Sequence, residues 1–170
     1  MSEDFKRRDL FRISAGGLLL AKTGTADAPT FFAKEEYAAV EELMETLIPS
    51  DDHSPGAKAA GCAAYWDKRL TETQDAGEKQ RWHEGVKSLE ALSQKMFGKS
   101  IAQAAPQERG QLMEAICKNE LHPKTPEEKF FNNLKAGTAF AYYTSDIGIH
   151  KEMGYKGNVY LKDFVGVEPT

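Results

Sequence analysis

The stretch GEKQRWHEGVKSLEALSQKMF, residues 77–97, has the clearest helical pattern in the chain and indicates its fold class. Apolar side chains recur in it every three or four residues, as they do on one face of an α-helix. A glycine follows at position 98, where a helix can end in the left-handed conformation. The stretch therefore predicts one long amphipathic helix. The residues of its apolar face are Trp82, Val86, Leu89, Leu92, Met96 and Phe97.

Two stretches on the N-terminal side of this helix are also helical in pattern. Residues 34–47 repeat apolar side chains at three- and four-residue steps, and Pro49 ends the helix because the residue before a proline avoids helical geometry. Ser54 followed by Pro55 is typical of an N-cap and a first helical position, and predicts a helix over residues 55–70. Small residues would line one face of that helix: Gly56, Ala57, Ala60, Gly61 and Ala64.

Two more helices are predicted on the C-terminal side. Pro106 begins one that ends near Asn119, and Thr125 to Glu128 form a capping box for another that ends near Tyr143. The apolar face of the last helix is wide, which indicates burial on more than one side. The sequence thus predicts an all-α fold, a compact bundle of about five helices.

After Thr144 the helical pattern stops. Glycines alternate with tyrosines and a phenylalanine, and no stretch alternates long enough to predict a strand. We expect an extended C-terminal tail that carries aromatic side chains. A tail of this length is uncommon in a compact domain unless it wraps another surface.

The first 28 residues have the order of an export signal. Arg7 and Arg8 precede a short apolar run, and Ala26-Asp27-Ala28 offers a cleavage site of the A-x-A type. The arginine pair, with Phe11 three residues after Arg8, places the segment among twin-arginine signals. The apolar run is too short to span a membrane as a helix. We therefore expect residues 1–28 to be a twin-arginine signal and residues 29–170 to be one helical domain in the periplasm.

Charge and cysteine content limit the partners and the chemistry. The whole chain has a net charge of −4, and no basic stripe interrupts the acidic domain, which argues against nucleic acid as a partner. Cys62 and Cys117 are the two cysteines. In an exported protein they can form a disulfide, join another chain or stay free, and the sequence leaves these three options open.

No motif for catalysis is visible. Asp51-Asp52-His53 is the densest group of titratable residues, but adjacent side chains do not point the same way and no second group stands at a metal-ligand spacing. A solvated loop is the simpler interpretation of these residues. We predict no catalytic, cofactor-binding or metal-binding residue in the chain. Two alternatives remain: a stand-alone periplasmic protein that binds a metal or ligand through the Asp51-Asp52-His53 loop, and a binding module with a small ligand between its helices.

Two sequence blocks resemble the gluconate 2-dehydrogenase small subunit (subunit 3) family. The first block runs from Thr46 to Pro49 and continues through Asp51, the Ser54-Pro55-Gly56-Ala57 run, Gly61 and Tyr65. The second block is Phe140-Ala141-Tyr142-Tyr143-Thr144-Ser145, followed by Gly154-Tyr155 and Gly157-Asn158. The resemblance spans nearly the whole chain, and residues 72–125 match it in helical pattern alone.

This resemblance implies a non-catalytic small subunit. Its partner would be an FAD-containing large subunit of the glucose-methanol-choline oxidoreductase type, which oxidises a sugar, sugar acid or sugar alcohol and passes electrons to a cytochrome c subunit carrying haem c. The small subunit would stabilise the large one and escort it through the twin-arginine translocase, and the complex would associate with the membrane. Related complexes oxidise gluconate at carbon 2 or glycosides at carbon 3.

The same resemblance suggests where the large subunit binds. Aromatic side chains are enriched at interface cores, so we expect the loop from Pro49 to Pro55 and the tail from residue 142 to 164 to contact it. Packing within the chain is the alternative for both. The predicted interface residues are Pro49, Asp51, Pro55, Gly56, Gly61, Tyr65, Tyr142, Tyr143, Tyr155 and Tyr160.

Overall fold

The computed structural model describes residues 28–158, and this part of the chain is helical. Five α-helices precede a short C-terminal helical turn, and no strand occurs among the described residues. The elements are α1 (Lys34–Leu47), α2 (Cys62–Glu72), α3 (Ala76–Phe97), α4 (Pro106–Cys117), α5 (Pro126–Tyr143) and the π-helical turn η2 (Gly148–Glu152). The all-α class and the bundle predicted from the sequence are confirmed.

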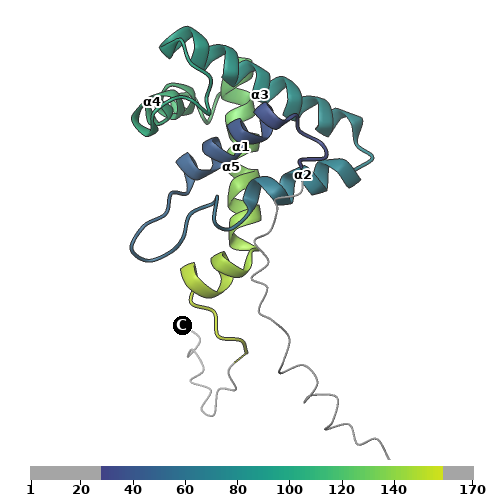
Figure 1. The fold of residues 1–170 in the computed structure, drawn as a ribbon, viewed down its shortest axis with the longest axis vertical. Helices are drawn as coiled ribbons and strands as arrows, with labels where there is room; N and C mark the ends of the chain where they lie inside the picture. Colours follow the sequence, from purple (N-terminus) through teal and green to yellow (C-terminus); the bar gives the residue numbers. More distant parts are fainter. Residues whose placement is uncertain (1–27, 159–170) are drawn as a thin grey trace, which may run out of the picture.

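Helix α5 is the centre of the bundle, because α1, α2, α3 and α4 all pack against it. Figure 1 shows α5 running down the middle of the molecule, with α3 lying across its upper end and η2 continuing below it. The buried side chains of α5 accordingly face several directions, as the wide apolar face predicted. They include Phe130, Phe131, Leu134, Thr138, Ala141 and Tyr142.

Local capping chemistry explains most helix ends. Thr125 accepts the backbone N–H of Glu128 at the start of α5, and the Glu128 carboxylate accepts the N–H of Thr125 in return. Helix α3 ends at Gly98, whose φ of 67° is the left-handed conformation that glycine adopts without strain. Helix α1 has the bounds predicted for it, residues 34–47.

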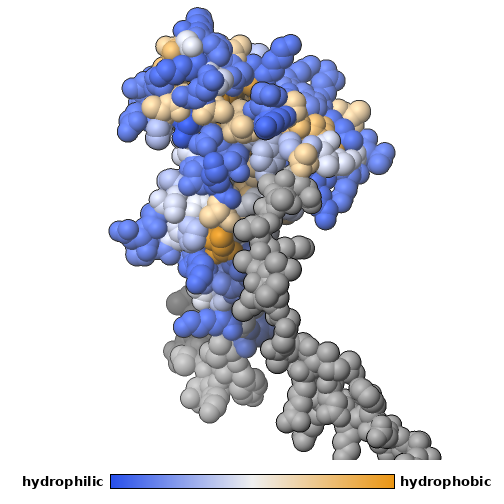
Figure 2. Space-filling view, viewed as in Figure 1, coloured by the Kyte–Doolittle hydropathy of each residue, from blue (hydrophilic) through white to orange (hydrophobic). Residues whose placement is uncertain are grey.

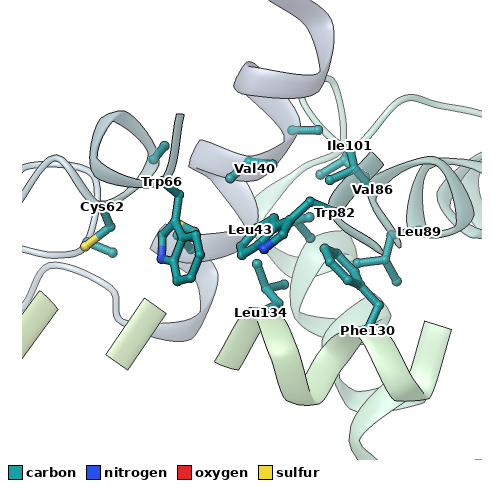
Figure 3. Packing of buried hydrophobic residues seen from close by; sticks show 14 of the residues in the cluster. Val40, Leu43, Cys62, Trp66, Trp82, Val86, Leu89, Ile101, Phe130 and Leu134 are labelled. Atoms are coloured by element: carbon teal, nitrogen blue, oxygen red, sulfur yellow. The ribbon is translucent and has the colours of Figure 1, made fainter. Parts of the chain in front are cut away.

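A layer of aromatic rings joins α2, α3 and α5. The Trp66 and Trp82 rings lie 4.7 Å apart between centroids, and the edge of Trp82 meets Phe130 at 5.5 Å. Figure 3 shows these rings next to Leu43 and Leu134 in the core. Two glycines allow this packing. A Cβ at Gly85 would lie 2.0 Å from Phe130, and one at Gly137 would lie 2.9 Å from Trp66.

The prediction for the second helix was wrong at its start. Pro55 does not begin a helix, and α2 starts only at Cys62, with Gly61 as N-cap at a φ of 70°. The small residues from Gly56 to Gly61 therefore do not share one helical face. They form turns held to α1, for example through the Ala57 N–H donating to the Ile48 carbonyl at 2.8 Å.

The C-terminal tail is also more ordered than predicted, as far as it is described. The Ser145 hydroxyl donates to the Tyr142 carbonyl at 2.6 Å and accepts the Gly148 N–H at 3.0 Å, which starts η2. A Cβ at Gly148 would lie 2.0 Å from the Tyr142 carbonyl oxygen, so only glycine lets the chain turn this closely beneath α5. The first part of the tail is therefore helical and packed on α5 rather than extended.

Candidate partner-binding surface

Three exposed aromatic side chains form a row on α2 and α5, which we call the aromatic row: Tyr65, Phe140 and Tyr143. Their exposed fractions are 39%, 53% and 43%. The Tyr65 and Phe140 rings lie 6.0 Å apart between centroids. Phe140 and Tyr143 are three residues apart on α5 and therefore neighbours on one side of the helix. On the face in Figure 2, hydrophilic side chains cover most of the described surface and hydrophobic ones form small spots.

The buried residues beside the row fix its position. The Trp66 indole N–H donates to the Gly137 carbonyl at 2.8 Å, which ties α2 to α5 directly behind Tyr65 and Phe140. The Tyr143 ring packs edge-on against buried Tyr142 at 5.3 Å. These contacts position the backbone that carries the row.

Phe140 also borders a hollow of about 390 Å³ between α2, α3 and α5. The two buried indoles of the core lie at this hollow, and the Arg69 guanidinium stands 5.1 Å above the Trp66 ring. Arg69 is paired with Glu78 at 3.1 Å, so its charge is already balanced within the chain. The aromatic row therefore combines protruding rings with a neighbouring recess.

The loop between α1 and α2 is built around two carboxylates. Asp51 accepts the N–H groups of His53 at 2.8 Å and Ser54 at 2.9 Å. The Ser54 bond, and after it the His53 bond, lowers the pKa of Asp51. Glu45 of α1 accepts the N–H groups of Ser50 and Lys58, at 3.1 and 2.7 Å. These bonds give the loop a defined shape, and they give Asp51 a structural role in it.

Gly56 lies inside this loop and packs against α1. A Cβ there would lie 2.5 Å from both a Glu45 oxygen and the Ser50 nitrogen. Gly56, which is among the predicted interface residues, is buried in the isolated chain. Pro49 and Asp51 are exposed, while Pro55 and Gly61 are half-buried.

Tyr142 is a second predicted interface residue that the structure places elsewhere. Its side chain is 1% exposed, and its hydroxyl donates to the Pro55 carbonyl at 2.8 Å. The two neighbouring tyrosines at the end of α5 point in different directions. Tyr142 faces the core and Tyr143 faces solvent.

The C-terminal segment adds two more exposed apolar side chains below α5. Met153 is 54% exposed and Tyr155 is 49% exposed. The Tyr155 N–H donates to the Ile149 carbonyl at 3.0 Å, so the chain folds back on η2. Tyr160 lies outside the described residues, as do Arg7, Arg8 and Phe11.

Sequence reasoning did not select Phe140 or Met153 as interface residues. The signal for Phe140 was available, because it stands three residues before Tyr143 and on another side of α5 from Leu134 and Ala141. Any wide apolar face predicts burial, however, and the pattern alone does not say which side remains open. Met153 had no such signal.

The cysteines are separate free thiols in the structure. Cys62 is buried at the start of α2, and Cys117 is half-buried at the end of α4. Burial, and next the charge of Glu45, raises the pKa of Cys62 to about 11. The sequence left three options open for the cysteines. In the structure, neither thiol forms a disulfide.

Within residues 28–158, no group of three or more His, Cys, Asp or Glu side chains is arranged to hold a metal ion. The Asp51-Asp52-His53 loop therefore does not assemble the site that the metal-binding alternative needs. None of the helices in the described part of the chain is long and apolar enough to cross a membrane.

A family model described as gluconate 2-dehydrogenase subunit 3 matches residues 34–159. The match covers all five α-helices, the loop before α2 and η2. No curated protein and no solved structure matches the chain.

Proposed function

The chain belongs to the gluconate 2-dehydrogenase subunit 3 family, and from this premise we propose that it is the non-catalytic accessory subunit of a dehydrogenase complex. The large subunit that it accompanies is an FAD-dependent enzyme of the glucose-methanol-choline type, which oxidises a sugar or sugar acid. Electrons leave that subunit for a cytochrome c. The chemistry lies in the partner, and this chain supplies a stabilising surface.

The observation that carries this proposal is the aromatic row. Tyr65, Phe140 and Tyr143 are exposed, whereas the core beneath them is filled by Trp66 and Tyr142. Clustered exposed aromatic side chains mark protein–protein contact sites, and such residues often dominate the binding energy. A catalytic role would instead need convergent polar groups, and the most prominent carboxylate of the loop, Asp51, is engaged in turn hydrogen bonds.

The second part of the proposal is export of the folded pair. The twin-arginine signal predicted in residues 1–28 carries this part, together with the acidic, compact domain that follows it. That route moves folded cargo, so a partner without a signal of its own would cross with this chain. The complex would then work in the periplasm, associated with the membrane through its other subunits.

A pull-down of the tagged full-length chain from its native cells tests the proposal. The expected eluate contains a larger protein in stoichiometric amount and shows the absorption spectrum of a protein-bound flavin. A colourless eluate with this chain alone, recovered folded, would overturn it. Metal analysis of the same eluate tests the metal-binding alternative, which requires about one bound metal ion per chain.

A further inference from the structure

Residues 30–33, which we call the strap, are bound to α2 before α1 begins. Asp67 of α2, 6% exposed, accepts four hydrogen bonds from the strap. The N–H and hydroxyl of Thr30 donate to one carboxylate oxygen at 2.7 and 2.9 Å. The N–H groups of Phe31 and Phe32 donate to the other oxygen at 3.0 and 2.9 Å. Three consecutive backbone donors thus converge on one buried carboxylate.

Side chains hold the strap from its other side. Phe32 is 3% exposed and meets the Trp82 ring edge-on at 6.0 Å. Phe31 stacks on His83 of α3 at 4.3 Å, and the His83 ring lies 3.2 Å from the Glu36 carboxylate. Phe32 therefore belongs to the core of the domain and Phe31 packs against it, although both residues precede the first helix.

We propose that the strap is a built-in stop for proteolytic processing and that Asp67 is the residue that sets it. An endoprotease needs an extended substrate with free backbone groups, and cleavage of a native chain requires local opening of the segment that is cut. The backbone donors of residues 30–32 are occupied, whereas Ala28 is exposed. The processed chain accordingly begins before Thr30.

The reaction is ordinary peptide hydrolysis. Water adds to the carbonyl carbon of the cut bond and the C–N bond breaks. The released N-terminal peptide keeps the new carboxylate, and the new α-amino group stays on the domain. This inference rests on the proposed function only for the position of the cut, which is predicted after Ala28, just outside the strap. The stop itself belongs to the fold and needs neither the partner nor export.

Thermolysin gives a sharp test, since it cuts on the N-terminal side of large apolar residues and the strap contains Phe31 and Phe32. The full-length purified chain is digested under native conditions and the fragments are identified by mass spectrometry. Fragments that begin at Phe31 or Phe32 should be absent while the domain stays intact. Asp67→Asn replaces an accepting oxygen by a donor, and should speed cleavage at these two bonds about tenfold or more.

Asp52→Asn is the matched control, because Asp52 is exposed on the loop before α2, and its fragments should equal those of the unaltered chain. Should Asp67→Asn lose its helical circular dichroism, Thr30→Ala decides the question. It removes the hydroxyl bonds to Asp67 and Thr71 and keeps the backbone, and should speed strap cleavage several-fold. Equal strap cleavage in the folded variants and in the unaltered chain would overturn the proposal.

Discussion

The Tyr142 hydroxyl lies 2.7 Å from the Ser54 hydroxyl, although the two residues stand 88 positions apart in the chain. The Tyr142 hydroxyl also donates to the Pro55 carbonyl at 2.8 Å, and the Ser54 hydroxyl lies 3.4 Å from the same carbonyl oxygen. This buried pair connects the end of α5 to the loop before α2. It explains why Ser54 does not cap a helix, since its hydroxyl is engaged by a residue far along the sequence.

Tyr142→Phe should lower the free energy of unfolding by about 1–3 kcal/mol, because it leaves the Pro55 carbonyl and the Ser54 hydroxyl without their partner in a buried place. Urea unfolding followed by circular dichroism measures the change. Tyr143→Phe is the control, since the Tyr143 ring is exposed, and it should cost less than about 0.5 kcal/mol. Equal effects of the two substitutions would contradict the role assigned to the Tyr142 hydroxyl.

Gly85→Ala should destabilise the domain by about 1–3 kcal/mol, because the added Cβ would meet the Phe130 ring at 2.0 Å and force α3 away from α5. Gly110→Ala offers the matched control. Gly110 lies inside α4 with nothing within 4 Å of the added Cβ, so this change should stabilise the domain by up to about 1 kcal/mol. Opposite signs for two Gly→Ala changes in helices would show that the difference comes from packing.

The strap should make stability depend on pH through Asp67. Burial alone would raise the pKa of Asp67, but the N–H groups of Thr30, Phe32 and Phe31 with the Thr30 hydroxyl outweigh it and hold the pKa below its ordinary value. The folded state then binds fewer protons than the unfolded one near the unfolded pKa of about 3.9. The stabilisation is therefore complete above that pH and is lost as the pH falls through the folded pKa.

Unfolding free energies measured by urea titration from about pH 6 down to about pH 3 check this expectation. Asp67→Asn should make the decrease shallower. Other carboxylates whose pKa is lowered, such as those of Asp75 and Glu108, should keep part of the slope in the variant. An unchanged slope in the variant would mean that Asp67 titrates alike in both states.

Tyr65→Ala combined with Phe140→Ala should reduce the large subunit recovered with the tagged chain about tenfold or more, because clustered aromatic anchors carry most of the energy in such interfaces. Thermal unfolding of the double variant should show that the isolated domain remains folded. Met96→Ala is the control, since Met96 is similarly exposed on α3, away from the aromatic row. Full recovery of the large subunit with the double variant would place the interface elsewhere.

Thiol labelling should distinguish the two cysteines. In the native chain a thiol reagent at about pH 8 should modify Cys117 first, whereas Cys62 is buried and has a pKa raised to about 11. One thiol should react quickly and the second only after denaturation, as peptide mapping would show. Two unreactive cysteines in the denatured, unreduced chain would instead indicate a disulfide.

The sequence predicted those parts of the fold whose signals are local. The bounds of α1, the glycine that ends α3 and the Thr125–Glu128 box of α5 depend on neighbouring residues and were all correct. The start of α2 failed for the opposite reason. Ser54 and Pro55 have the composition of a cap, but their hydrogen-bond partner is Tyr142, and this long-range contact overrides the local preference.

The exposure of the residues named for the candidate surface was predicted correctly for some of them and incorrectly for others. Tyr65, Tyr143 and Tyr155 were selected and are exposed, while Tyr142 and Gly56 were selected and are buried. Neighbouring aromatic residues on a helix point to different sides, and their composition does not reveal which side the bundle covers. The exposure of Phe140 depends on how α2 and α5 pack against each other, and the sequence pattern does not specify this packing.

The central position of α5 has a consequence for the life of the free subunit. The helix that closes the core also carries Phe140 and Tyr143, so a partner that holds these rings also holds the element on which α1, α2, α3 and α4 depend. By mass action, binding to the folded state alone raises the apparent stability of the whole domain. If the proposed partner binds this surface, we expect the chain without that partner to be less stable and more prone to aggregate, and its abundance in the cell to follow that of the partner.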